Sequence, residues 1–570
     1  FPYTTLFRSL RAPYGYYRYA SMDDFMTGEK PMLYGITYGY NGKDAPGAEL
    51  TFGMLGAYAQ DEYSITPNLK LTYGLRFDLP LYFDDLLGNA AIKEQSFNGT
   101  NVDVSEWPKS KLLISPRLGF NWDIKGDRSI VLTGGTGLFT GLLPFVWFTN
   151  QPTNAGQMQN MVEFETSELP ANFAFNPNYK ETLTQNPDMF PSTPGNEVPG
   201  AIAYVDPNFK MPQVWRSNVN AEFQLPYGFM LSVGAMYTRD IYNVVQKNMN
   251  EKAPSGTYNE QPGRVYWTKN NYYDNPKTKT VIQLTNGDEK GYQYSFNAVL
   301  TKKFDFGFTG SFGYTYTMAK DMTANPGSSA ASVWQNNVAV NSLNDPGVSY
   351  SLFSTPHRLI ANASYEVAYA NMKTTVSLFY TGYQQGRFSY TYSNDMNGDG
   401  NYSDLMYVPA SKEEMTFVDI KDKQNNVTYS AVDQQEDFWN YVNNDSYLND
   451  HKGQYVERAS SLEPWIHRFD MKIAQDFYAK IGSRKYGIQV SLDMLNIGNL
   501  LNSKWGAYRS CGLQSYDNVR LLKTASKVGE PLTYQMNASS REVFQKNSKW
   551  DYTASTGSAW QMQLGVKFTF

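Results

Sequence analysis

The chain has 570 residues, a net charge of −5 and an aromatic content of 15%. A negative balance without a dense basic stretch excludes a nucleic-acid partner, and the single cysteine, Cys511, excludes an internal disulfide framework or a cysteine-based metal cluster. No run of about 18 apolar residues occurs, which excludes a membrane-spanning helix and agrees with a mean hydropathy of −0.51.

The first nine residues, Phe-Pro-Tyr-Thr-Thr-Leu-Phe-Arg-Ser, resemble the translation of a common DNA-sequencing adapter. Our hypothesis is that residues 1–9 are an artefact and that residues 10–570 are the protein. Residues 1–10 also lack the charged and then apolar layout of a signal peptide. On this hypothesis the chain is the carboxy-terminal part of a longer protein.

Alternation of polar and apolar side chains is the main structural signal. Every second residue from Leu69 to Leu79 is apolar, and the residues between them are Lys70, Thr72, Gly74, Arg76 and Asp78. A strand turns successive side chains to opposite faces, so this segment has one apolar and one polar face. The same alternation recurs at residues 118–124, 229–237, 292–300, 312–316, 469–473, 486–494 and 561–570.

Short and long connections alternate between these segments. The short ones are residues 66–68, 125–128, 226–228, 304–306, 369–371 and 479–484, and the long polar ones are residues 84–111, 142–211, 246–289, 322–355, 394–463 and 500–557. This is the layout of an outer-membrane barrel, which has short periplasmic turns and long external loops.

We therefore predict an all-β fold, an antiparallel transmembrane β-barrel of about 14 strands in the cell outer membrane, with lipid as a partner. The alternative is a water-soluble propeller or a stack of sandwiches. Soluble strands usually have about 5–6 residues and modest connections, whereas these segments are longer and the loops between them are much longer.

A Pro shortly before an Arg opens several of the strands that descend from the long loops. The pairs lie at residues 116–117, 212–216, 356–358 and 464–468. A Pro at the first residue of a strand loses no ladder hydrogen bond, and an Arg at the rim can face lipid headgroups or the lumen. The pattern indicates a repeated β-hairpin.

Two loop segments carry candidate binding residues. In the apolar run at residues 142–148, Phe145 and Trp147 are candidates for stacking on a ligand, although an interfacial anchor or a loop packed into the barrel mouth is the favoured interpretation. In the second segment, Asp395, Asn397, Asp399 and Asp404 place oxygen atoms at a spacing that suits Ca²⁺.

The calcium pattern is incomplete. A Gly stands at its sixth position, but the twelfth position is Met406, where an EF-hand needs a bidentate Glu. Asp404 would have to substitute for it. The alternative is a solvated turn of Asn, Asp and Gly residues.

We predict no enzymatic activity. The three histidines, His357, His451 and His467, are far apart in the sequence, and no G-x-S-x-G motif occurs. A barrel lipase stays open as an alternative, because its Ser, His and carboxylate would meet only in space.

Several segments resemble the barrels of TonB-dependent outer-membrane receptors, especially the Oar-like branch related to SusC-like transporters of Bacteroidetes. They are residues 55–62, 69–77, 115–122, 139–141 and 493–502. The resemblance implies a barrel of about 22 strands with a plug in its lumen. It also implies that the plug, the segment that contacts the TonB complex and about a third of the barrel lie upstream of Leu10.

The function implied by the resemblance is transport of a large solute, with capture by the external loops and passage through a polar lumen. A surface lipoprotein that caps the mouth is a further partner that the resemblance allows. The alternative is a passive porin or an adhesin, in which no energy coupling occurs.

Overall fold

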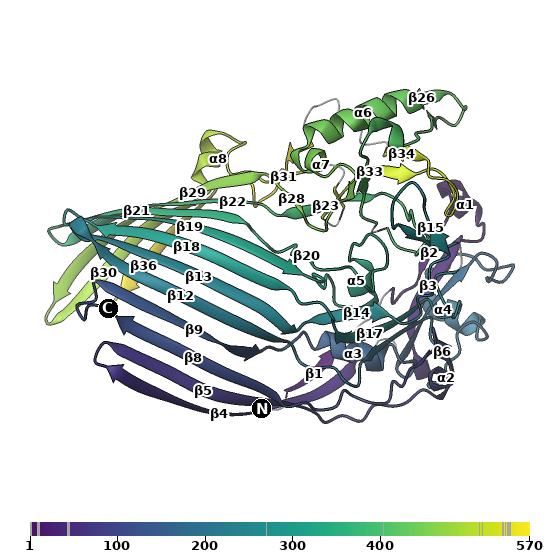
Figure 1. The fold of residues 1–570 in the computed structure, drawn as a ribbon, viewed down its shortest axis with the longest axis horizontal. Helices are drawn as coiled ribbons and strands as arrows, with labels where there is room; N and C mark the ends of the chain where they lie inside the picture. The colour runs from purple at the N-terminus through teal and green to yellow at the C-terminus, as the bar shows by residue number, and fades with distance from the viewer. Residues whose placement is uncertain are drawn as a thin grey trace.

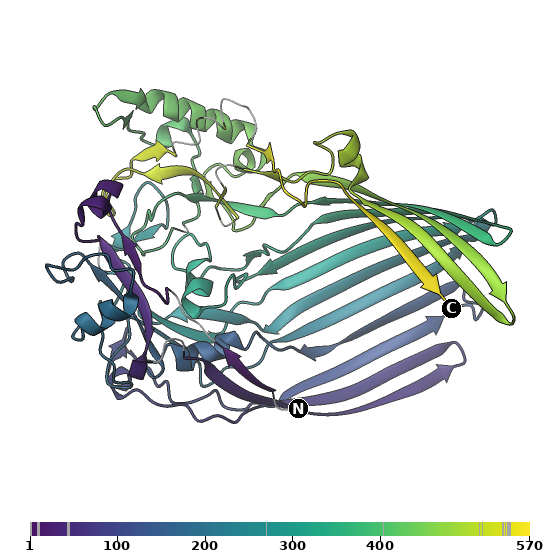
Figure 2. The ribbon, with the colours of Figure 1, turned by 180° about the vertical axis from the view of Figure 1, so that it is seen from behind.

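The computed structural model describes residues 3–7, 12–42, 46–268, 271–402, 404–511, 514–515, 517–537, 541, 543 and 549–570. Its main feature is one large curved sheet of long strands, and the smaller strands and the helices other than α8 gather toward one end of it (Figure 1). Figure 2 shows the same sheet from behind, with the carboxy-terminal strand near one of its edges.

The large sheet contains fourteen strands in one path, and each neighbouring pair is antiparallel. In order, they are β1 (Tyr3–Phe7), β4 (Ala48–Thr66), β5 (Leu69–Tyr82), β8 (Leu113–Asp123), β9 (Ile130–Thr140), β12 (Gln213–Leu225), β13 (Phe229–Tyr242), β18 (Tyr292–Lys303), β19 (Phe308–Asp321), β21 (His357–Tyr369), β22 (Met372–Gln384), β29 (Trp465–Ile481), β30 (Arg484–Leu495) and β36 (Gln561–Thr569). Short β20 (Ser349–Tyr350) pairs with β19 outside this path. Among the described strands the two edges, β1 and β36, do not pair with each other, so the sheet is open.

The register confirms the two faces that the alternation predicts. Leu71 lies opposite Phe120, and Ile488 lies opposite Phe568, all on the apolar face. Ile488 is 46% exposed, although its side chain is entirely apolar. A continuous face of exposed apolar side chains is what a membrane-facing sheet presents to lipid.

Tight turns join the strands at one end of the sheet. β29 and β30 continue up to Ile481 and from Arg484, so their turn is shorter than the predicted residues 479–484. β4 has 19 residues and β29 has 17, whereas a tilted strand needs about 9–11 to cross a bilayer. The sheet therefore extends beyond the membrane.

We call the long connections, residues 83–112, 141–212, 243–291, 322–356, 385–464 and 496–560, the external domain. With the segment before β4, it holds the small sheets: β2 (Tyr16–Arg18), β3 (Leu33–Gly39) and β10 (Gln159–Glu165); β11 (Ala201–Val205), β14 (Val244–Asn248) and β17 (Thr280–Asn286); and β23 (Arg387–Tyr392), β28 (Ser461–Leu462), β32 (Gln514–Ser515), β33 (Asn518–Thr524) and β34 (Tyr534–Met536).

Two-stranded ribbons complete the β-structure. They are β6 (Ser96–Phe97) with β7 (Thr100–Asn101), β15 (Gly256–Thr257) with β16 (Val265–Tyr266), β24 (Tyr407–Val408) with β27 (Gln454–Tyr455), β25 (Ile420–Lys421) with β26 (Val427–Tyr429), and β31 (Arg509–Ser510) with β35 (Asp551–Tyr552).

The helices are short. They are α1 (Met22–Thr27), α2 (Ala90–Lys93), α3 (Val146–Thr153), α4 (Tyr179–Gln185), α5 (Ala330–Gln335), α6 (Ala431–Asn444), α7 (Ser446–Asp450) and α8 (Ile497–Leu501), with 3₁₀ turns η1 (Tyr40–Gly42), η2 (Pro226–Gly228) and η3 (Lys412–Glu414). Within the described residues, none of these helices has the length and apolar character that a bilayer crossing requires.

The external domain has hydrophobic cores of its own, which the prediction of long polar loops missed. In the largest core, Tyr390 and Tyr392 of β23 pack with Leu522 of β33 and Phe438 of α6, and all four are buried. Tyr390, Tyr392 and Phe438 belong to one connection and Leu522 to another, so this core forms only when the two connections meet. The long connections are therefore a folded domain above the sheet.

The amino-terminal hypothesis stays a prediction. Residues 3–7 form β1 and pair with β4, whereas residues 1–2 and 8–9 lie outside the described residues. Backbone pairing of five residues depends little on their side chains, so it does not distinguish coding sequence from a translated adapter.

Candidate functional site

Four arginines of the repeated hairpin lie on the polar face of the sheet. Arg117 and Arg216 both lie opposite Gly137, while Arg358 lies opposite Tyr383 and Arg468 opposite Thr381. These positions share a face with the polar rows, so the arginines line the interior side rather than the lipid side. Interior polar residues of a membrane barrel form the lumen.

Two of the histidines lie on the opposite, apolar face. His357 Nδ1 lies 2.7 Å from the Tyr314 hydroxyl, and His467 Nδ1 lies 2.8 Å from the Tyr380 hydroxyl. Trp465 stacks with both histidines, with centroid distances of 6.1 and 5.7 Å. An aromatic belt of this kind is typical of the membrane interface.

Two cavities flank α5 in the external domain. The larger has a volume of about 300 Å³ and the smaller about 260 Å³, and Asn336 lines both. Amide and hydroxyl groups dominate the polar lining: Asn154, Gln159, Ser329 and Thr280 in the larger cavity, and Asn337, Ser389 and Asn518 in the smaller. Such groups can donate and accept hydrogen bonds from a polar solute.

The smaller cavity also contains charged groups of both signs. Arg458 is 5% exposed and pairs with Asp321 at 2.9 Å. Burial lowers the pKa of Arg458, and the Asp321 carboxylate opposes this shift. Burial raises the pKa of Asp517 on the same cavity. The cavity therefore holds an arginine in an ion pair and an aspartate beside its amide and hydroxyl groups.

The structure places Phe145 and Trp147 at the start of α3, against the external end of the sheet. The ring of Phe145 lies 4.9 Å from the ring of Phe52 on β4, and Trp147 Nε1 donates to the Gly327 carbonyl at 3.2 Å. Both side chains are partly buried against the same hydrophobic cluster. Ligand stacking by these two residues stays a prediction.

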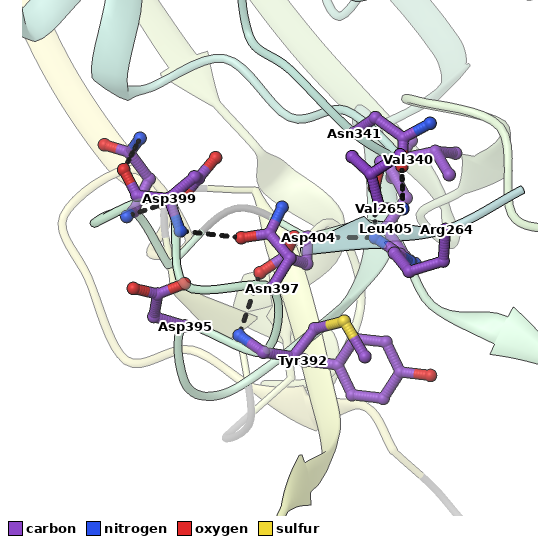
Figure 3. Close-up of polar contacts among 12 residues, drawn as sticks. Arg264, Val265, Val340, Asn341, Tyr392, Asp395, Asn397, Asp399, Asp404 and Leu405 are labelled. Atoms are coloured by element: carbon purple, nitrogen blue, oxygen red, sulfur yellow. Dashed lines mark hydrogen bonds and ion pairs between the residues drawn. The ribbon is translucent and has the colours of Figure 1, made fainter. Parts of the chain in front are cut away.

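The loop with Asp395, Asn397, Asp399 and Asp404 is a tight, buried turn whose side chains accept backbone N–H groups (Figure 3). Asp395 accepts from Gly398 at 2.7 Å and from Gly400 at 2.9 Å. In the same way, Asn397 accepts from the Asp399 N–H at 3.0 Å. Asp404 accepts from the N–H of Met396 at 3.1 Å.

Arg264 closes this loop from the side, and sequence reasoning did not find it. Its side chain is fully buried, and Nη1 lies 3.4 Å from Asp404 Oδ1. The guanidinium also donates to the carbonyls of Val340 and Leu405, which lie beside it in Figure 3. Its Nε donates to Gln261 at 3.2 Å. Arg264 and Asp404 are 140 residues apart, so no local motif could reveal the pair.

The loop carboxyls share one electrostatic environment. Burial raises the pKa of Asp404 to about 7, although the Arg264 guanidinium opposes the shift. Burial also raises the pKa of Asp399 well above its usual value, and the neighbouring Asp404 and Asp395 carboxylates add to this. The three carboxyls therefore repel one another when ionised.

The calcium assignment stays a prediction. Within the described part of the chain, no three acidic, histidine or cysteine side chains are placed so that they could hold one ion. The oxygens named above are occupied by backbone N–H groups and by Arg264. A bound cation would have to share or replace these contacts.

Comparison with protein families decides the class of the protein. Residues 3–505 match the model of the outer membrane beta-barrel domain. The chain belongs to this outer-membrane barrel family. The predicted all-β membrane fold and the location in the cell outer membrane are thereby confirmed, and the family is one of membrane barrels rather than enzymes.

Solved barrels resemble the chain at low identity. The outer membrane transporter YddB from Escherichia coli is 12% identical, with a TM-score of 0.45, and the match covers 100% of this chain and 50% of YddB. The siderophore receptor PirA from Acinetobacter baumannii is 11% identical, with a TM-score of 0.37 and coverage of 86% and 48%. The FrpB iron transporter from Neisseria meningitidis is 10% identical, with a TM-score of 0.35 and coverage of 79% and 42%.

This outer-membrane barrel chain thus spans about half the length of the solved proteins that it resembles. Comparison with curated proteins gives no match.

Proposed function

We propose that this outer-membrane barrel takes part in TonB-dependent transport of a large solute. The external domain captures the solute and the polar face of the sheet conducts it. The observation that carries the proposal is that the polar face ends beneath a folded domain with two hydrogen-bonding cavities that meet at Asn336. A solute held there lies at the entrance of the lumen.

The assignment to the TonB-dependent receptors rests on the resemblance of residues 55–62, 69–77, 115–122 and 493–502 to the Oar-like and SusC-like receptors. It makes the TonB complex a partner through a part of the protein upstream of Leu10. It also allows a surface lipoprotein to cap the external domain. These partners supply the energy coupling and the closed mouth that the proposal needs.

A passive porin or an adhesin is the competing function. Uptake in a strain with the intact locus distinguishes it, with radiolabelled oligosaccharides, ferric siderophores and peptides as the panel of probes. A TonB-dependent transporter stops net uptake of its solute when a protonophore collapses the proton gradient, while surface binding persists. Uptake that continues unchanged under the protonophore would support a passive porin and contradict the proposal.

The capture step has its own test in Asn336→Ala. Asn336 is exposed and borders both cavities, so the substitution removes hydrogen-bonding groups without opening a core. We expect binding of the transported probe to weaken about tenfold, the effect of losing one or two hydrogen bonds. Asn440→Ala, at an exposed position of α6, is the matched control and should leave binding unchanged.

A further inference from the structure

A groove of about 770 Å³ crosses the apolar face of the sheet, from β18 to β29. One row of neighbouring residues runs through it: Leu300, Phe312, Ala361, Tyr380 and Phe469, which the register places side by side on five strands. Large side chains stand at both ends of the row and Ala361 at its middle. The groove is therefore a trough across a surface that faces lipid.

Small residues also form the floor of the next row. Gly310 and Ala363 pair with each other on β19 and β21, and both line the groove. On a lipid-facing surface, side chains this small leave room for a molecule that lies against the backbone. The trough is thus two rows wide along the strands.

Lys302 supplies the charge at one end of the groove. It lies on the apolar face opposite Gly310, one residue before β18 ends at the short turn. Its Nζ lies 4.6 Å from the ring centroid of Phe229 and 4.3 Å from that of Phe304. Within the described residues, no carboxylate forms an ion pair with Lys302, so its ammonium is held by aromatic rings and is free to bind an anion.

The position of Lys302 fits the membrane interface. A lysine on the lipid face is unfavourable by about 2–4 kcal/mol at the bilayer midplane and by about 0–1 kcal/mol near the interface. Short turns face the periplasm in outer-membrane barrels. Lys302 therefore lies at the level of the periplasmic headgroups.

The groove rises from this level into the hydrocarbon. Gly310 lies three residues after Gly307 in its turn, whereas Phe469 lies far above the turn at Gly482 on β29. Five strands at a spacing of about 4.8 Å span roughly 19 Å. With a strand tilt of about 35–45°, the row climbs roughly 11–13 Å, and the groove continues to His467 in the aromatic belt, so only its lower part, from Lys302 to Ala361, lies in the periplasmic half of an apolar band of about 25 Å.

We propose that this groove binds one glycerophospholipid of the periplasmic leaflet, with its phosphate at Lys302 and an acyl chain along Ala361 and Ala363. The part of the trough from Lys302 to Ala361 matches the depth of one leaflet, its lining is mainly apolar, and its one ammonium stands at the headgroup level. The site lies on the outside of the sheet. It is therefore independent of the solute path proposed above.

Native mass spectrometry of the full chain, folded and delipidated in detergent, tests the proposal. The probes are phosphatidylglycerol, which is anionic, phosphatidylcholine, which is zwitterionic, and lipid A. We expect the wild-type protein to retain one phosphatidylglycerol about tenfold more tightly than one phosphatidylcholine, because a charge-assisted contact adds to the apolar contact.

Two variants separate headgroup from acyl-chain binding. Lys302→Gln should abolish the preference for phosphatidylglycerol while weak binding of both lipids persists. Ala361→Leu combined with Ala363→Leu should fill the trough and remove the specific binding of both lipids. Both changes lie on the lipid-facing side, so the sheet itself keeps its hydrogen bonds.

Lys303→Gln is the matched control, because Lys303 lies next in the sequence but on the polar face, opposite Thr309. It should behave as the wild-type protein does. Equal affinity of the wild-type protein for the two phospholipids, or equal effects of Lys302→Gln and Lys303→Gln, would overturn the proposal. Tighter retention of lipid A than of phosphatidylglycerol would assign the groove to the other leaflet and would also overturn it.

Discussion

The sheet and the external domain are stabilised in opposite ways. In the sheet, strands that follow one another in the sequence pair through short turns, and apolar side chains point outward to lipid. In the external domain, contacts join distant segments, such as Gln261 with Tyr534, 273 residues apart, and apolar side chains point inward. The same type of substitution therefore has opposite effects in the two regions.

The two regions also differ in the burial of their charged side chains. The lumen side of the sheet carries arginines that remain accessible, such as Arg117 and Arg216. The external domain buries Arg264 completely and satisfies it with carbonyl groups and Asp404. A buried charge with many partners is far more sensitive to truncation than an accessible one.

The largest effect should follow the loss of Arg264. Arg264→Ala leaves Asp404 buried without its cation and two carbonyl groups buried without a donor, so we expect the external domain to lose about 3–5 kcal/mol of stability. Rapid tryptic cleavage within residues 385–464 of the membrane-inserted protein is the measurement. Arg541→Ala, at an exposed position of the same domain, is the control and should change stability by less than about 1 kcal/mol.

The sheet should show the reverse sensitivity. Leu492→Arg places a charge on the lipid-facing side, opposite Leu564 near the middle of β36, and should destabilise the protein by about 2–4 kcal/mol in urea unfolding from lipid vesicles. Gln489→Arg changes a lumen-facing residue of the same strand and should have little effect. If both variants unfolded alike, the assignment of the two faces would be wrong.

The difference between the sheet and the external domain determines how much of each region the sequence predicts. Period-two alternation is local, so segments such as 69–79, 229–237 and 486–494 reveal their strands, faces and turns without any knowledge of their partners. The pair of Arg264 and Asp404 in the external domain has no such local signal, because these residues acquire their roles only when distant loops meet. The sequence pointed to the acidic loop but not to the cation beside it.

Two glycines with positive φ, one in each region, allow a matched comparison in which the expected loss of stability is smaller. Gly398 in the external loop has a φ of 81°, and an added Cβ would lie 2.1 Å from the Trp267 carbonyl oxygen. Gly482 in the β29–β30 turn has a φ of 63° and open space around it. Backbone strain alone costs about 1–2 kcal/mol.

We therefore expect Gly482→Ala to destabilise the protein by roughly 1 kcal/mol and Gly398→Ala by roughly 2–3 kcal/mol. Urea unfolding measures the first, and tryptic cleavage of the external domain measures the second. Equal losses would mean that the loop can move away from Trp267, contrary to the tight packing described above.

The last comparison concerns calcium and the three loop carboxyls. If the loop holds Ca²⁺, a concentration tenfold above the dissociation constant should stabilise the external domain by about 1.4 kcal/mol, measured by tryptic cleavage with and without a chelator. Asp422→Asn changes an exposed Asp turn of another connection and is the control, because its carboxylate likewise accepts backbone N–H groups.

Asp399→Asn distinguishes a calcium-binding loop from a loop whose charge is balanced by Arg264 alone. The pKa of Asp399 is raised by burial and by its neighbours, so neutralising it removes repulsion and should stabilise the metal-free loop. If Ca²⁺ binds, the variant gains this stability and loses the calcium response. If Arg264 alone balances the charge, the wild-type protein shows no calcium response and the variant is still more stable, which would assign the loop a purely structural role.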